Sequence, residues 1–103
     1  MDEQITTVIE SSSQRLFPNL SLNQILAELL LERAQKNLIK YQAMIRQFKA
    51  KYKQDFDTFR QQILRTQPDF ETEQDYFDWE LAVTGISDMS EEIKSLQSIE
   101  AFA

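Results

Sequence analysis

Residues 31–52 read LERAQKNLIKYQAMIRQFKAKY, and their apolar pattern decides the fold. The apolar positions alternate between steps of three and four residues, at Leu31, Ala34, Leu38, Tyr41, Ile45, Phe48 and Tyr52. This is the a/d spacing of a coiled-coil seam, so the stretch is predicted to be a helix with one apolar edge. Ser21, with Gln24 three residues later, makes a capping-box pattern that begins this helix. Because the chain then runs without Gly or Pro, the helix is predicted over about residues 22–53.

A second seam with the same spacing lies in the last third of the chain, at Trp79, Ala82, Ile86, Met89, Ile93 and Leu96. It predicts a second long helix over about residues 73–98. Two helices with one seam each can bury both seams by packing together. We therefore predict an all-α protein whose two long helices form an antiparallel hairpin with coiled-coil-like seams.

The region between the two seams contains the signals for helix ends. Asp55 is the predicted N-cap of a short connecting helix over about residues 56–66, and Pro68 ends it. Thr72 is the predicted N-cap of the second long helix. Gly85 costs about 1 kcal/mol relative to Ala in a helix interior, so we expect a soft point near residues 85–90. A break followed by a new helix capped at Ser90 is the alternative.

Composition excludes several classes of protein. A chain of 103 residues has room for one domain, and one Gly with two Pro is too few for a fold built on tight turns or a Gly-rich nucleotide loop. The absence of His and Cys removes zinc fingers, thiol nucleophiles, Ser-His-Asp triads and disulfides. No apolar run approaches the roughly 20 residues that span a bilayer. We expect a soluble cytoplasmic protein that is not an enzyme and takes no cofactor or metal.

Residues 1–20 are hard to assign from sequence. The string Ile5-Thr6-Thr7-Val8-Ile9 is β-branched, and Ser11-Ser12-Ser13 and Phe17-Pro18-Asn19 separate it from the long helix. This arm is expected to be poorly ordered or a short helix, while residues 21–103 form a single helical domain.

Charge is segregated along the chain. Residues 33–53 contain seven cations and no anion, whereas residues 54–103 contain 12 acidic and 3 basic residues. A basic strip from Arg33 to Lys53 is one way to bind nucleic acid. The net charge of −6 repels a polyanion, so we favour the interpretation that the basic helix lies beside the acidic helix and pairs with it.

The stretch from Asp69 to Glu80 interleaves six carboxylates with four aromatic residues. Glu71, Asp75 and Asp78 share a helix face and could be read as metal ligands, but helical-bundle metal sites normally include His, and no EF-hand loop is present. The stretch also fits a helix start with a buried aromatic face or an acidic docking surface. If a partner is captured, the predicted binding residues are Glu71, Asp75, Tyr76, Asp78, Trp79 and Glu80.

The order of these elements resembles a protein family. Lys51-Tyr52, then Asp55-Phe56-Asp57-Thr58-Phe59, then Phe70-Glu71-x-Glu73-x-Asp75-Tyr76-x-x-Trp79-Glu80 is similar to small acidic helical prokaryotic proteins that are antitoxin-like partners of small toxins. The resemblance covers about residues 22–98. In that family Gly-Met-Ser follows the tyrosine, and Lys53-Gln54-Asp55 stands there in this chain. The resemblance implies a protein with no activity of its own that acts by binding a partner.

The expected function is therefore a non-catalytic, antitoxin-like interaction module that binds a partner protein, such as a basic nuclease toxin. The alternative is a small helical nucleic-acid-binding or regulatory protein that uses the basic strip. A single hairpin would also leave Ile25, Leu26, Leu29 and Leu30 partly exposed. Exposed apolar patches on small proteins commonly mark interfaces, so a homodimer is predicted.

Overall fold

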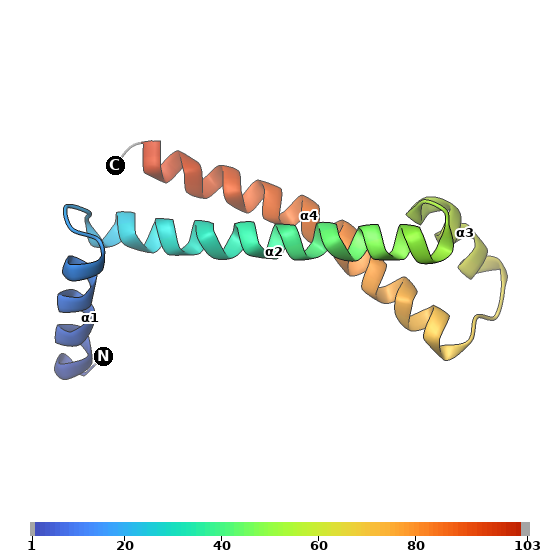
Figure 1. Cartoon of the computed structure of the whole chain (residues 1–103), viewed down its shortest axis with the longest axis horizontal. Coiled ribbons are helices and arrows are strands. Elements are labelled where there is room, and N and C mark those ends of the chain that lie inside the picture. Colours follow the sequence, from blue (N-terminus) through green and yellow to red (C-terminus); the bar gives the residue numbers. More distant parts are fainter. Residues whose placement is uncertain (1, 102–103) are drawn as a thin grey trace.

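The computed structural model describes residues 2–101 and consists there of helices joined by short connections (Figure 1). The four helices are α1 (Glu3–Leu16), α2 (Leu22–Tyr52), α3 (Phe56–Arg65) and α4 (Phe70–Ala101). No strand occurs between residues 2 and 101. The predicted all-α class is confirmed; the predicted 21–103 domain extends two residues beyond the described part.

The two long helices form the predicted hairpin. α4 runs back along α2 and crosses it, so that the C-terminal end of α4 lies near the N-terminal end of α2 (Figure 1). Every residue of both predicted seams is buried or half-buried, as expected if the seams face each other. α3 packs against α4 at the turn of the hairpin. The principal extents are 57 × 30 × 19 Å, and the radius of gyration is 19.9 Å, against about 13 Å for a compact globule of this length.

The seam contains two kinds of core. At the N-terminal end of α2 it is aliphatic, with Leu31 and Ala34 against Leu96 and with Met89 and Ile93 packed beside them. At the turn of the hairpin it is aromatic, because α3 adds its own rings. The members of this aromatic cluster are Phe59, Tyr76 and Trp79, with Ile45, Phe48, Tyr52, Phe56 and Ile63 packed against them.

Side-chain caps fix where the helices begin. The Ser21 hydroxyl accepts from the Gln24 N–H (3.1 Å) and the Gln24 side chain accepts from the Ser21 N–H (2.7 Å), which confirms the capping box. Asp55 caps α3 as predicted. The predicted N-cap of α4, Thr72, is wrong: Asp69 Oδ1 accepts from the Thr72 N–H at 2.8 Å, so α4 begins three residues before residue 73. Asp69 follows Pro68 directly and offers the carboxylate acceptor, which leaves Thr72 inside the first turn.

α4 continues unbroken past Gly85 and Ser90, so the expected single helix is confirmed and the alternative break with a new helix at Ser90 does not occur. Gly85 is buried against the ring of Tyr41 on α2. A Cβ at this position would lie only 2.5 Å from Tyr41 Cε2. The glycine therefore permits close approach of the two helices, and that packing offsets its low helix propensity.

α2 ends in a left-handed residue that is not glycine. Lys53 has φ 53° and ψ 39°, and its N–H donates to the Lys49 carbonyl. Glycine adopts this conformation at little cost, whereas other L-residues lose about 1 kcal/mol or more. Lys53 therefore gives α2 the helix-ending geometry that glycine favours, with a less favourable residue.

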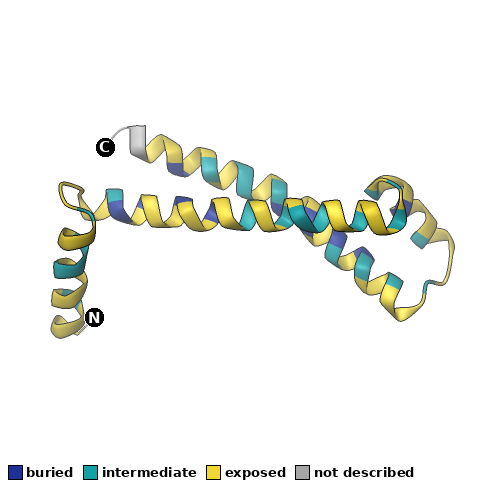
Figure 2. Ribbon diagram, viewed as in Figure 1, coloured by how far each residue is buried: buried dark blue, intermediate teal, exposed yellow. Residues whose placement is uncertain are grey.

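Residues 3–16 are helical, which decides between the two alternatives left open for the N-terminal arm. Asp2 caps α1, since its carboxylate accepts from the Gln4 N–H, and the helix buries no residue. It leaves the N-terminal end of α2 and lies across the direction of the hairpin, as Figures 1 and 2 show.

We predict that Gly85→Ala lowers the free energy of unfolding by about 1–3 kcal/mol, since the added methyl overlaps the Tyr41 ring. Ala in place of Gly normally stabilises a helix by about 1 kcal/mol. Urea denaturation in the Tyr41→Ala background provides the control, because there the same substitution should be stabilising. Equal effects in both backgrounds would show that Tyr41 does not require the glycine.

Candidate partner-binding surface

The stretch from Asp69 to Glu80 forms the cap and first three turns of α4, and its side chains point to all sides of the helix. Some face the hairpin seam, some border α2, and some face solvent. The six predicted binding residues are therefore separated. Trp79 and Tyr76 are in the core, Glu71 and Asp75 hold a lysine of α2, and Asp78 and Glu80 lie nearer solvent.

Trp79, one of the predicted binding residues, is fully buried in this chain. Its indole lies between aromatic rings of two other helices, with centroid distances of 5.6 Å to Phe48 of α2 and 5.2 Å to Phe59 of α3. Tyr76 is 9% exposed, and its hydroxyl donates to Glu80 at 3.1 Å. Both aromatic residues are therefore part of the core of the hairpin.

Glu71 and Asp75 are joined to the basic end of α2. Lys51 Nζ lies 2.6 Å from Asp75 Oδ2 and 3.0 Å from Glu71 Oε1. The Tyr52 hydroxyl donates to the same Asp75 oxygen at 2.5 Å. This is where the expected pairing between the basic and acidic helices occurs.

The protonation states of Lys51, Tyr52 and Asp75 follow from the contacts among them and with Glu71. Partial burial acts against the charged form of Asp75, but the hydrogen bonds from Lys51 and Tyr52 outweigh it and hold the pKa below its ordinary value. The hydrogen bond to Asp75, and then that to Glu71, raises the pKa of Lys51. Burial, then the hydrogen bond to Asp75, raises the pKa of Tyr52. At neutral pH the cluster is a charged aspartate held by an ammonium and a neutral phenol.

The metal interpretation of Glu71, Asp75 and Asp78 has no geometric support. Across the described residues, no three acidic side chains are grouped so as to hold an ion. The Lys51 ammonium lies between the first two carboxylates, and Asp78 accepts a hydrogen bond from Gln74 at 3.1 Å.

The side of α4 turned away from the seam carries apolar side chains that the sequence interpretation missed. Phe70 is 83% exposed, Phe77 52% and Leu81 57%. Exposed Glu73 and Glu80 lie on the same side of the helix. We call these five residues the outer α4 face. Of the six predicted binding residues only Glu80 belongs to it, although the offsets of 7 and 11 residues from Phe70 to Phe77 and Leu81 already place the three apolar residues on one face.

Most of the basic strip on α2 is not neutralised by α4. Among the described side chains, Lys51 alone of the seven cations forms an ion pair with α4, while Lys36 pairs with Glu32 one turn earlier on α2. Lys40, Arg46, Lys49 and Lys53 are exposed and have no carboxylate within 4 Å in that part of the chain. The expected pairing of the two helices is therefore limited to the Lys51 site.

No protein-family model, curated protein or solved structure matches this chain. Within residues 2–101, no helix is long and apolar enough to cross a membrane. The arrangement of charged and exposed apolar side chains is thus the basis on which a function can be assigned.

We predict that the free energy of unfolding falls as the pH drops from about 5 to 2 and that Asp75→Asn makes this fall shallower. The sign follows from the lowered pKa: the contribution of Asp75 is present above its ordinary value of 3.8 and is lost as pH falls through the folded value. At pH 7 the substitution should cost about 1–2 kcal/mol through weaker hydrogen bonds to Lys51 and Tyr52.

The measurement is thermal or urea unfolding at a series of pH values. Asp88→Asn is the matched control, since exposed Asp88 has no hydrogen bond or ion pair among the described side chains. Identical pH profiles for Asp75→Asn and the unmodified chain would contradict the role given to this carboxylate.

Proposed function

We propose that this chain is a non-catalytic, antitoxin-like binding protein of the cytoplasm that captures a basic partner protein on the outer α4 face. The observation that carries the proposal is the exposure of Phe70, Phe77 and Leu81 beside the carboxylates of Glu73 and Glu80. Aromatic side chains are common anchors at interfaces, and flanking charges select and steer a partner of opposite sign. The resemblance to antitoxin-like proteins suggests a small toxin, such as a nuclease, as that partner.

The state of the carboxyl groups supports binding over catalysis. General acid catalysis at neutral pH needs a carboxyl whose pKa is raised. Hydrogen bonds from Thr58 and Thr72 instead lower the pKa of Asp55 and Asp69, and the Asp75 contacts lower that of Asp75. These three groups are suited to capping and ion pairing.

Nucleic-acid binding is the second candidate, and the unpaired cations of α2 favour it. Lys40, Arg46, Lys49 and Lys53 are exposed, and such side chains could contact phosphates. The net charge of −6 acts against this role at long range. Binding of the purified chain to DNA or RNA with a steep loss of affinity in added salt would support this candidate over the first.

We also propose that the chain works as a homodimer. It exposes 7923 Å², whereas a compact monomer of 12.2 kDa exposes about 6,100 Å². The difference of roughly 1,800 Å² exceeds the ~800 Å² that one protein contributes to a standard interface. Of the four residues predicted to remain partly exposed, Leu26, Leu29 and Leu30 are 47–57% exposed and Ile25 is buried.

The partner proposal predicts a photo-crosslink from the outer α4 face. With a benzophenone amino acid replacing Phe77, irradiation of cells of the source organism should give an adduct with a basic protein. Glu73→Lys combined with Glu80→Lys should reduce the adduct yield by about tenfold, because the new charges repel that partner. Mass spectrometry would identify the adduct.

Glu91→Lys combined with Glu92→Lys is the matched control, since it makes the same change in net charge at exposed positions farther along α4. That variant should retain the adduct. Equal losses in both double variants would indicate a general charge effect, and an adduct with nucleic acid would favour the second candidate.

The homodimer proposal predicts a mass of twice 12.2 kDa by sedimentation equilibrium at micromolar concentration. The dimer mass should persist in 1 M NaCl, because the exposed leucines proposed to form the dimer interface are aliphatic and salt screens only interactions between charges. A clean single-chain mass at these concentrations would refute it.

A further inference from the structure

α1 carries an apolar stripe that is uncovered in the single chain. Ile5, Val8, Ile9 and Leu16 lie on one side of the helix and are 44–74% exposed. α1 buries no residue, although it is helical over 14 residues. Isolated helices of this length are only marginally stable in water, so α1 needs a surface against which to pack its stripe.

The α2 helix of the same chain does not cover this stripe. Near the start of α2, the other side of α1 (Glu10, Ser13 and Gln14) borders a shallow hollow with Leu20, Leu22 and Ile25. The connection between the helices is short and holds Asn19 at φ 75°. α1 thus presents polar side chains to its own α2 and turns its apolar stripe away.

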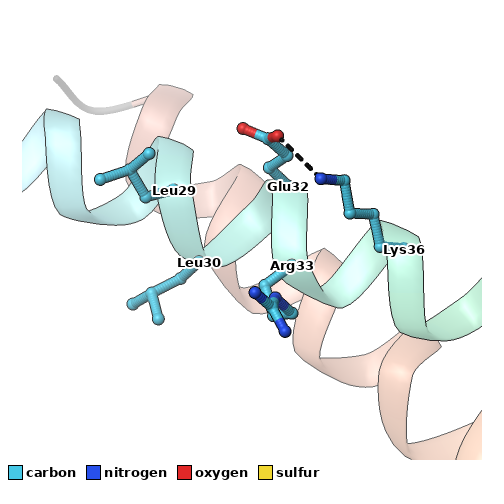
Figure 3. A pocket seen from close by; sticks show the side chains of 5 residues that line it. All are labelled: Leu29, Leu30, Glu32, Arg33 and Lys36. Carbon is cyan, nitrogen blue, oxygen red and sulfur yellow. Dashed lines mark ion pairs between the residues drawn. The ribbon is translucent and has the colours of Figure 1, made fainter.

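The first half of α2 has an uncovered face of its own. Leu22, Leu26, Leu29 and Leu30 are 47–57% exposed and lie outside the seam with α4. A hollow of about 320 Å³ continues this face toward the basic strip, lined by Leu29, Leu30, Glu32, Arg33 and Lys36. Figure 3 shows the two leucines and Arg33 projecting from α2, with Glu32 and Lys36 joined as an ion pair.

The geometry points to a second copy of this chain as the occupant: α1 of one copy lies antiparallel on the leucine face of α2 of the other. This inference rests on the proposed homodimer and names its interface. Read backwards, α1 has Leu16, Ser12, Ile9 and Val8 at steps of 4, 3 and 1. Read forwards, α2 has Leu22, Leu26, Leu29 and Leu30 at the same steps, so the two rows can lie opposite each other in an antiparallel pair.

The charges and the lengths of the two segments agree with this antiparallel pairing of α1 with α2. Continuing the same pairing places the acidic start of α1, Asp2 and Glu3, beside Arg33 and Lys36 of the other copy. α1 is about 21 Å long at 1.5 Å per residue, and residues 22–36 of α2 span about the same distance. Because each copy has both surfaces, reciprocal exchange makes two such contacts and closes the assembly as a two-fold dimer.

The test uses single cysteines, which the chain otherwise lacks. Full-length Val8→Cys protein is mixed with full-length Leu30→Cys protein and oxidised, and non-reducing electrophoresis measures the mixed dimer. We expect a cross-link between these two variants. Val8→Cys mixed with Ile39→Cys is the matched control and should give little, since exposed Ile39 is outside the leucine face.

A second measurement does not depend on cysteine geometry. Val8→Glu should raise the dimer dissociation constant about tenfold or more, while Ile39→Glu should leave it unchanged, with helix content checked by circular dichroism. A dimer that persists without the Val8–Leu30 cross-link and tolerates Val8→Glu would overturn this interface and leave the homodimer proposal standing. A single-chain mass throughout would overturn both. An intrachain disulfide in the Val8→Cys, Leu30→Cys double variant would show that α1 folds back on its own α2 and would also overturn the exchange.

Discussion

The indole of Trp79 joins three of the four helices, and the hairpin depends on its burial. It is fully buried on α4 and packs against Phe48 and Tyr52 of α2 and Phe56 and Phe59 of α3, at centroid distances of 5.2–6.2 Å. Such aromatic pairs contribute about 0.5–1.5 kcal/mol each beyond the burial of apolar area. The indole N–H has no acceptor among the described residues, and leaving it unpaired costs roughly 1–3 kcal/mol. Packing of the ring outweighs this cost and closes the turn of the hairpin.

The position of this ring determines which carboxylates of α4 are available for binding. With Trp79 and Tyr76 turned into the core, the neighbouring side of α4 faces the end of α2, where Asp75 meets Lys51 and Tyr52. The opposite side faces solvent, and it carries Phe77. The same helix therefore supplies the core, an internal ion pair and an external surface, each from a different side.

The sequence predicts the hairpin well, because heptad spacing and side-chain caps are local signals and the two long helices pack along a single seam. It does not predict how the six proposed binding residues are distributed around α4, because a dense acidic stretch shows which residues are present but not which side of the helix each one takes. The packing role of Gly85 could not be predicted for a related reason: helix propensity describes the residue alone, whereas its role depends on Tyr41, which is 44 positions earlier in the chain. α1 could not be assigned since none of the described residues covers its apolar stripe, which leaves local sequence as the guide.

An elongated hairpin also separates its uncovered surfaces. α1 and the leucine face of α2 lie at one end of a molecule 57 Å long, and the start of α4 lies at the end where α3 closes the turn (Figure 1). The first surface is aliphatic and suits a copy of the same chain, since like net charges repel and the contact has to come from apolar burial. The second combines aromatic residues with carboxylates and suits a partner of opposite charge. Because the two surfaces share no residue, self-association at one end leaves the outer α4 face free for capture at the other.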